Sequence, residues 1–215
     1  MSRQETPGSA PLRIAVDIGG TFTDLATFDE KTGKLSFGKA LSTHGELVNG
    51  IQHTLDSAGV DLANGYLFLH GSTIAINTLL ERNGANTALL ITEGFRDIYE
   101  IGRVNRPDAY NLFFGKHVPL VKRSQRYEVR ERLRADGSLH RELDEDHVRE
   151  TAKALKGQGI EAVAVLLLHS YRNPAHEQRV KAILQEELPG AFVTASHELS
   201  QEYREFERAS TAVAN

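Results

Sequence analysis

Two short stretches of the chain carry residues that fit phosphate binding. The first runs Asp17-Ile18-Gly19-Gly20-Thr21-Phe22-Thr23-Asp24, so that an acid precedes two glycines and two threonines flank a phenylalanine. Glycines let backbone N–H groups approach phosphate oxygens closely, and threonine hydroxyls add donors. Asp17 would lie near a magnesium ion through water, because magnesium retains much of its hydration shell. A plain hairpin with Gly19 and Gly20 in its turn is the alternative, and the residue types alone do not separate the two.

The second stretch is His70-Gly71-Ser72-Thr73, with Asn77 one helical turn further on. It lies between an expected strand, 66–69, and an expected helix, 74–82. Ligands of α/β proteins bind at the carboxyl ends of strands, and the N–H groups at a helix N-terminus favour anions. The alternative is that Ser72 or Thr73 caps the helix and His70 makes a local hydrogen bond. Without further context, the capping alternative is favoured.

Three weaker features are also consistent with a site. The first feature is a glycine-bearing loop that contains Arg96, Arg103, Asn105 and Arg106. Arginines in such a loop can bind carboxylate or phosphate, or they can be surface charges. The residue types do not decide between these two roles. His169 follows a buried strand, where a histidine with satisfied hydrogen bonds is favoured over a site residue. Eight Lys and Arg residues lie between Lys116 and Arg141, and a solvated hairpin is favoured over an anion-binding surface.

Composition excludes several classes of chemistry. The chain has 215 residues and no cysteine, so disulfides, thiolate zinc sites, iron–sulfur clusters and a cysteine nucleophile are absent. Its net charge of -4 gives no argument for nucleic acid. The longest apolar run, 162–168, has the length of a core strand and is too short to cross a bilayer. We therefore expect a cytoplasmic protein with neither a nucleic-acid nor a membrane partner.

The elements expected to position these stretches follow a regular order. Three antiparallel strands come first, and a helix begins at a capping box, Thr43-His44-Gly45-Glu46, and ends at Gly59. Strands and helices then alternate, apart from a less regular region at about 95–143 that contains an Asp136-Gly137 turn. A meander followed by such alternation predicts an α/β fold with a mixed sheet flanked by helices. The expected segments are strands at 12–18, 23–28, 35–37, 66–69, 87–91, 160–168 and 192–193, and helices at 47–58, 74–82, 148–156, 174–188 and 201–214.

Taken in order, the motifs strongly resemble those of the hydantoinase A/5-oxoprolinase family, which includes N-methylhydantoinase A and acetone and acetophenone carboxylase relatives. Residues 17–24 alone would indicate only the wider actin-like ATPase superfamily. The resemblance becomes specific through the later motifs and covers essentially everything after residue 12. Those motifs are His70–Thr73, Asn77–Arg82, Thr92–Asp97, Arg103–Pro107, Tyr127–Arg132, Leu168–Pro174, Ser196–Glu198 and Glu207–Thr211.

The resemblance implies a ribonuclease-H-like, actin-like ATPase domain that uses ATP and Mg²⁺. Members resemble ATP-dependent enzymes that open cyclic amides, or subunits of ketone carboxylases, in which ATP phosphorylates a carbonyl-derived oxygen. By resemblance, Asp17 organises the metal and belongs to the catalytic group with His70, Thr73 and Asn77. Asp24 is expected to be structural. The residues expected to bind the cofactor are Gly19, Gly20, Thr21, Thr23, Gly71 and Ser72.

Family chains are several times longer, which shapes the expected domains and partners. We expect a disordered leader at 1–11, the family's N-terminal domain at 12–200, with an insertion at about 95–143, and the start of a truncated segment at 201–215. The substrate would be a small cyclic amide or ketone. The expected partner is a hydantoinase B-like subunit or a missing C-terminal half. A module of a cyclic-amide hydrolase is the leading hypothesis, and a carboxylase module or a non-catalytic fragment that binds a partner domain are the alternatives.

Overall fold

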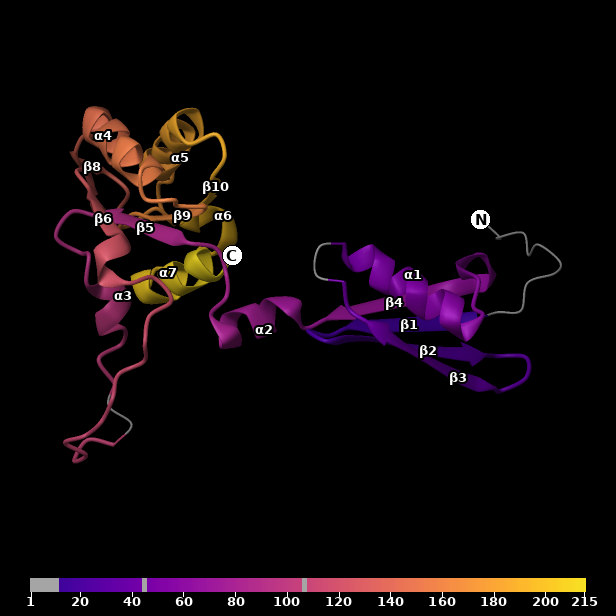
Figure 1. The fold of residues 1–215 in the computed structure, drawn as a ribbon. Helices are drawn as coiled ribbons and strands as arrows, with labels where there is room; N and C mark the ends of the chain where they lie inside the picture. The colour runs from indigo at the N-terminus through magenta and orange to yellow at the C-terminus, as the bar shows by residue number, and fades with distance from the viewer. Residues whose placement is uncertain (1–11, 44–45, 106–107) are drawn as a thin grey trace. The chain divides into compact units, whose positions relative to one another are not determined.

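The computed structural model describes residues 12–43, 46–105 and 108–215 (Figure 1). Two compact units divide the chain, one ending at Asn83 and the other beginning at Gly84. The expected leader at 1–11 lies outside the described residues. None of the helices in the described parts of the chain has the length and apolar character needed to cross a membrane.

The first unit is a four-stranded mixed sheet with a helix along one face (Figure 1). The strand order is β3-β2-β1-β4, in which β1 pairs antiparallel with β2 and parallel with β4. Strand β1 alternates, so that Ile14, Val16 and Ile18 are buried while Asp17 is exposed on the other face. The elements are β1 (Leu12–Ile18), β2 (Phe22–Asp29), β3 (Leu35–Leu41), α1 (Leu47–Ala58), η1 (Leu62–Asn64), β4 (Gly65–Ser72) and α2 (Ile74–Glu81).

Helix α1 is held against this sheet by close approach and by its end signals. A Cβ placed on Gly38 of β3 would lie 3.1 Å from both Ala58 Cβ and Thr54 O, so glycine is what lets the helix approach. Gly59 ends α1 in the left-handed conformation, with φ of 65°, as predicted. The N-cap is Glu46, which makes no side-chain capping hydrogen bond. The predicted capping box is therefore wrong in this respect, and its His44 and Gly45 lie outside the described residues.

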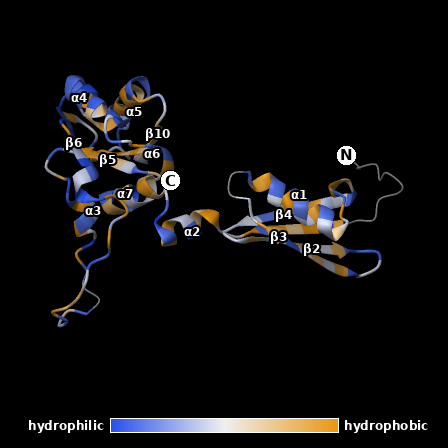
Figure 2. Ribbon diagram, viewed as in Figure 1, coloured by the Kyte–Doolittle hydropathy of each residue, from blue (hydrophilic) through white to orange (hydrophobic). Residues whose placement is uncertain are grey.

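The second unit is a four-stranded parallel sheet, ordered β10-β9-β5-β6, with helices on both faces (Figure 1). Helices α4 and α5 pack on one face through Val148, Leu155 and Val180. Helices α3 and α7 pack on the other. The central strands of this sheet consist largely of apolar residues (Figure 2). The elements are β5 (Thr87–Thr92), α3 (Ile98–Ile101), η2 (Arg123–Gln125), β6 (Arg126–Val129), β7 (Arg132–Leu133), β8 (Leu139–Arg141), α4 (Glu145–Lys156), β9 (Ala162–Leu166), α5 (Ala175–Glu187), β10 (Phe192–Ala195), α6 (Ser196–Leu199) and α7 (Glu205–Ala214).

The order of elements confirms the predicted α/β class, but the strands form two main sheets where one mixed sheet was expected. Among the described strands, β5 pairs with β6 and β9, in the second sheet. Within the irregular region 95–143, β6 joins the second sheet, and β7 and β8 form the predicted hairpin around Gly137. At the chain's end, Ala209 and Ala212 of α7 are buried in the second unit's core.

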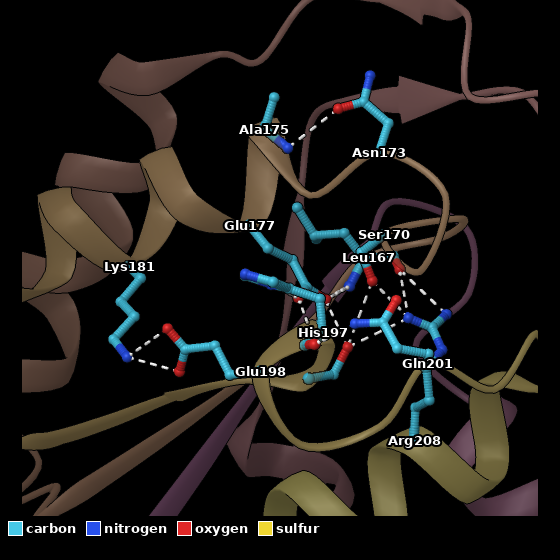
Figure 3. Close-up of polar contacts among 11 residues, drawn as sticks. Leu167, Ser170, Asn173, Ala175, Glu177, Lys181, His197, Glu198, Gln201 and Arg208 are labelled. Atoms are coloured by element: carbon cyan, nitrogen blue, oxygen red, sulfur yellow. Dashed lines mark hydrogen bonds and ion pairs between the residues drawn. The ribbon is translucent and has the colours of Figure 1, made fainter.

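A buried polar network fixes the carboxyl ends of β9 and β10 (Figure 3). Glu177 Oε1 accepts hydrogen bonds from Leu167 N and Ser196 Oγ, both at 2.7 Å. Glu177 Oε2 accepts from His197 Nδ1 at 2.7 Å. From the opposite side, fully buried Arg208 donates to Ser196 Oγ at 3.1 Å and to Leu167 O at 3.3 Å. The Glu177 carboxylate and the Arg208 guanidinium thus hydrogen-bond to the same two residues, Leu167 and Ser196. These bonds join α5 to α7 across the end of the sheet.

Candidate functional site

The two phosphate-binding candidates lie side by side in the first unit. Strands β1 and β4 are parallel neighbours, with Asp17 paired to Gly71 and Ile18 paired to Ser72. Thr73 N donates to Ile18 O at 3.1 Å, which ties the β4–α2 loop to the end of β1. Both stretches therefore end at the same edge of the sheet, where α/β proteins bind ligands.

The glycine turn touches helix α2. A Cβ placed on Gly20 would lie 2.9 Å from Asn77 Nδ2, a distance that real Cβ atoms do not adopt. Asn77 Nδ2 also donates to Thr73 Oγ1 at 3.4 Å. Neither Gly19 nor Gly20 is among the residues with positive φ. Glycine at position 20 therefore leaves the space that the Asn77 amide occupies, so the turn and Asn77 lie close together.

The turn itself is a hairpin, closed by Gly19 N donating to Phe22 O at 2.9 Å. The hairpin and the phosphate-loop interpretations are thus compatible, since one describes the local structure and the other its use. Thr21 is exposed at the tip. Its backbone carbonyl accepts from Ser42 N at 2.9 Å, which anchors the turn to the end of β3.

Asp17 packs directly against the backbone of the neighbouring strand. A Cβ placed on Gly71 would lie 3.0 Å from Asp17 Oδ1. The exposed carboxylate borders a hollow of about 710 Å³ on the sheet face opposite α1, which Asp24 and Lys39 also line. Lys39 Nζ lies 3.0 Å from Asp24 Oδ1. Sequence reasoning missed Lys39, because its place beside Asp17 follows from the pairing of Asp17 with Asp24 and of Asp24 with Lys39, which only the strand register decides.

Thr23 lies on the other face of the sheet from Asp17. It is fully buried, and its Oγ1 lies 3.1 Å from Ser42 Oγ, which in turn donates to Gly19 O at 2.8 Å. Its hydroxyl therefore supports the glycine turn from below and does not extend into the hollow beside Asp17. Ser42 was also missed, because no local motif marks a residue that reaches the turn from β3.

His70 and Ser72 are positioned differently from Asp17. His70 borders the same hollow, but it pairs with Val16, so strand alternation places its Cβ on the α1 face. Ser72 Oγ accepts from Ile74 N at 3.4 Å, in line with the capping alternative. Thr73 occupies the N-cap position of α2 without a capping side-chain hydrogen bond. The structure thus groups Asp17 with Gly71, and Gly20 with Thr73 and Asn77, but leaves Thr23 and the side chain of His70 outside these groups.

The described residues contain no preformed metal cage. Among the described residues, no group of three or more His, Asp or Glu side chains is placed to hold a metal ion. Magnesium is commonly bound through one or two carboxylates together with substrate phosphates. Asp17 is an exposed carboxylate, and the glycines at positions 20 and 71 leave room for the side chains of Asn77 and Asp17.

The fold and this site define an α/β protein in which a glycine turn meets a strand–helix loop. A family described as "Hydantoinase/oxoprolinase N-terminal region" matches residues 13–188. The chain belongs to the hydantoinase/oxoprolinase family and corresponds to its N-terminal region, as the motifs predicted.

Relatives in this family include amide hydrolases and carboxylases. The caprolactamase subunit alpha of Pseudomonas jessenii is 35% identical over 213 residues, which cover 94% of this chain and 30% of the relative. The acetophenone carboxylase gamma subunit of Aromatoleum aromaticum is 34% identical over 222 residues, covering 93% of this chain and 30% of the relative. A nucleotide-free structure of acetone carboxylase, from work on its ATP-dependent mechanism, matches with a TM-score of 0.84 and 28% identity over 95% of this chain and 32% of that chain. The chain spans about 30% of the length of the curated relatives described here.

Proposed function

We propose that this chain is the phosphate-binding module of an ATP-dependent cyclic-amide hydrolase of the hydantoinase/5-oxoprolinase type. The observation that carries the proposal is the contact between Gly20 and Asn77, which joins two separately recognised motifs at one sheet edge. The similarity to a caprolactamase subunit supports a cyclic amide as substrate. In this proposal, the first unit is half of a ribonuclease-H-like ATPase core, and the remaining half of the nucleotide site comes from a further domain or subunit.

In this proposal, each residue has a role that follows from its position. Asp17 orients a magnesium ion through water, and the backbone N–H groups around Gly19 and Gly20 hold phosphate oxygens. Gly71 leaves room for the Asp17 carboxylate. Thr73 and Asn77, which are hydrogen-bonded to each other, face the turn and donate to the transferring group or substrate. Thr23 acts from beneath the turn, with Ser42, and does not contact phosphate in this assignment.

Ser72 and His70 complete the second stretch. Ser72 holds the start of α2 so that its first N–H groups point toward the phosphates. His70 lies at the open edge of the sheet, where a further domain would meet it. A carbonyl-derived oxygen is a poor leaving group. When bound, ATP would supply the phosphoryl group that makes this oxygen easier to displace. Binding and positioning of that group are the tasks of the chain's own residues.

A carboxylase module is the second candidate. It is favoured by the similarity to the acetophenone carboxylase gamma subunit and by the match to the acetone carboxylase structure. Both candidates use the same phosphate half-site, and they differ in the substrate that accepts the phosphoryl group. Coexpression with downstream subunits and assay with 5-oxoproline, a hydantoin and acetophenone would identify the acceptor.

Calorimetric titration of the 215-residue chain with ATP and magnesium tests the half-site. We expect weak binding, with a Kd of about 1 mM, because half of the contacts are supplied elsewhere. Asp17→Asn should abolish the magnesium-dependent part of the binding. Asp56→Asn is the matched control, since Asp56 is exposed on α1 and its side chain accepts a hydrogen bond from Gln52 at 2.8 Å. Equal binding by the wild type and Asp17→Asn would refute the assignment.

A further inference from the structure

A second hollow lies in the second unit, at the carboxyl end of its sheet. The connection leaving β5 runs to β6 over the α3 face, whereas the connection leaving β9 runs to β10 through α5 on the opposite face. Adjacent parallel strands whose connections diverge in this way form a topological switch point, the usual ligand crevice of open α/β sheets. The hollow has a volume of about 570 Å³, within the range of small-molecule sites. Its lining includes Arg132, Arg134, His140, Arg141 and His169, and we call it the basic pocket.

The two carboxylates that line the basic pocket already have partners. Glu131 is buried, accepts a hydrogen bond from the Thr92 hydroxyl, and lies 2.7 Å from His176 Nδ1. Glu93 Oε2 lies 2.5 Å from Arg141 Nη1. These acids are therefore engaged by the protein itself, and the character of the pocket is set by its remaining cationic groups.

Two guanidinium groups in the pocket lack a carboxylate partner among the described residues. Arg132 lies over the ring of Phe95, 4.6 Å from its centroid, and Arg134 donates to Leu139 O at 2.7 Å. Arg132 is also paired directly with Arg141 across the β7–β8 ladder. Like charges directly opposite each other destabilise a strand pair. Because Glu93 neutralises Arg141, Arg132 is the member of this pair whose charge has no carboxylate partner among the described residues.

His169 is the most unusual residue of the pocket. Its φ is 60°, and its Nδ1 is buried without a hydrogen-bond partner among the described residues. The favoured expectation of a satisfied histidine at the strand edge is therefore wrong. Left-handed backbone at a residue other than glycine costs free energy and occurs preferentially at functional sites.

The backbone before His169 is held by a buried hydrogen-bond chain. Thr92 Oγ1 donates to Glu131 and accepts from Leu168 N at 3.0 Å. This chain fixes the ends of β5 and β9 relative to each other beside the pocket. The imidazole therefore projects from a rigid support, as a preorganised binding group should.

We propose that the basic pocket binds a small anion through its carboxylate or phosphate group. Arg132 and Arg134 contact the anion, because guanidinium groups match the paired oxygens of both classes. His169, which lines the pocket, contributes its other ring nitrogen, Nε2, as a hydrogen-bond donor. The pocket lies in the other unit from the phosphate-binding turn, so the proposal is independent of the function proposed above.

The test is a titration of the full chain followed by imidazole NMR signals of its histidines. Inorganic phosphate and succinate are the two probes, each added at constant ionic strength against chloride. We expect a saturable shift of the His169 and His140 signals with one or both probes, with a Kd of about 1 mM or tighter. A response to phosphate alone assigns a phosphate ligand, and a response to succinate alone assigns a carboxylate.

Variants connect the response to the pocket. Arg134→Gln, at an exposed position, and His169→Asn, which tolerates left-handed backbone, should each weaken binding at least about tenfold. Arg179→Gln is the matched control, because Arg179 is exposed on α5 and paired with Glu145 outside the pocket. If neither probe gives a saturable shift, or if Arg179→Gln weakens binding as much as Arg134→Gln, the proposal is overturned.

Discussion

The side-chain amide of Asn77 occupies the space that a Cβ on Gly20 would need, at 2.9 Å from its position. One residue comes from a hairpin turn and the other from a helix more than fifty residues further along the chain. A small residue on one element is therefore matched to a polar residue on the other. This pairing makes the two motifs a single site and can be tested directly.

Replacing Gly20 with alanine should lower the affinity for ATP and magnesium while leaving the stability of the fold nearly unchanged. Asn77 is the far end of a side chain that can move, so Gly20→Ala should change the free energy of unfolding by less than about 1 kcal/mol. The displaced amide should lower the affinity for ATP and magnesium at least about fivefold. Chemical denaturation and calorimetry measure the two quantities.

A double-mutant cycle distinguishes steric conflict from a local effect on the turn. If Asn77 is the conflicting group, Gly20→Ala should cost little further affinity in an Asn77→Ala background. Gly190→Ala serves as the control, because a Cβ there meets nothing within 4 Å. Additive losses in the cycle would show that the contact with Asn77 is not the cause.

The pH dependence of stability should include a contribution from Glu177. Burial alone raises the pKa of this carboxyl, but hydrogen bonds from His197, the Leu167 amide and Ser196 outweigh burial and lower it below its usual value. A lowered pKa in the folded state stabilises the protein above the unfolded-state pKa of about 4.3. That stabilisation is lost as the pH falls through the folded-state pKa.

Urea denaturation between neutral pH and about pH 3 measures this contribution. Glu177→Gln should lower stability at neutral pH and should show a shallower loss on acidification than the wild type. Glu150→Gln, at an exposed position on α4, should retain the wild-type slope. Identical slopes for the wild type and Glu177→Gln would contradict the prediction.

Arg208 should be among the most sensitive positions for stability. Arg208→Met removes the buried donors to Leu167 O and Ser196 Oγ and leaves the Glu177 charge without the nearby cation. We expect a loss of about 3 kcal/mol in the free energy of unfolding. Arg179→Met, on the exposed side of α5, should cost less than about 1 kcal/mol. Comparable losses of stability for the two variants would contradict the prediction that the buried network around Arg208 makes a special contribution.

The isolated chain should not turn over substrate. In the proposed function this chain supplies only one side of the nucleotide site, so the 215-residue protein should show no ATPase activity stimulated by 5-oxoproline or a hydantoin. A coupled phosphate-release assay, with Asp17→Ala as background, measures this. Stimulated activity above that background would show that the chain holds a complete site.

The sequence by itself determined the order of the main strands and longer helices and the two motif stretches, because these depend on local periodicity and turn chemistry. The short helices α3 and α6 were not expected. Gly59 as a helix end and the Asp136-Gly137 hairpin follow from backbone preferences of single residues. The family followed from several motifs in a fixed order.

Only the tertiary structure decided which of those residues share a site. Strand pairing placed Thr23 beneath the turn and Asp17 on the opposite face, and it divided the strands between two main sheets. The network of Glu177 with Arg208 and the unpaired nitrogen of His169 depend on contacts between distant segments. Such contacts are set by packing and register, which no local pattern in the chain encodes, so composition and spacing did not reveal them.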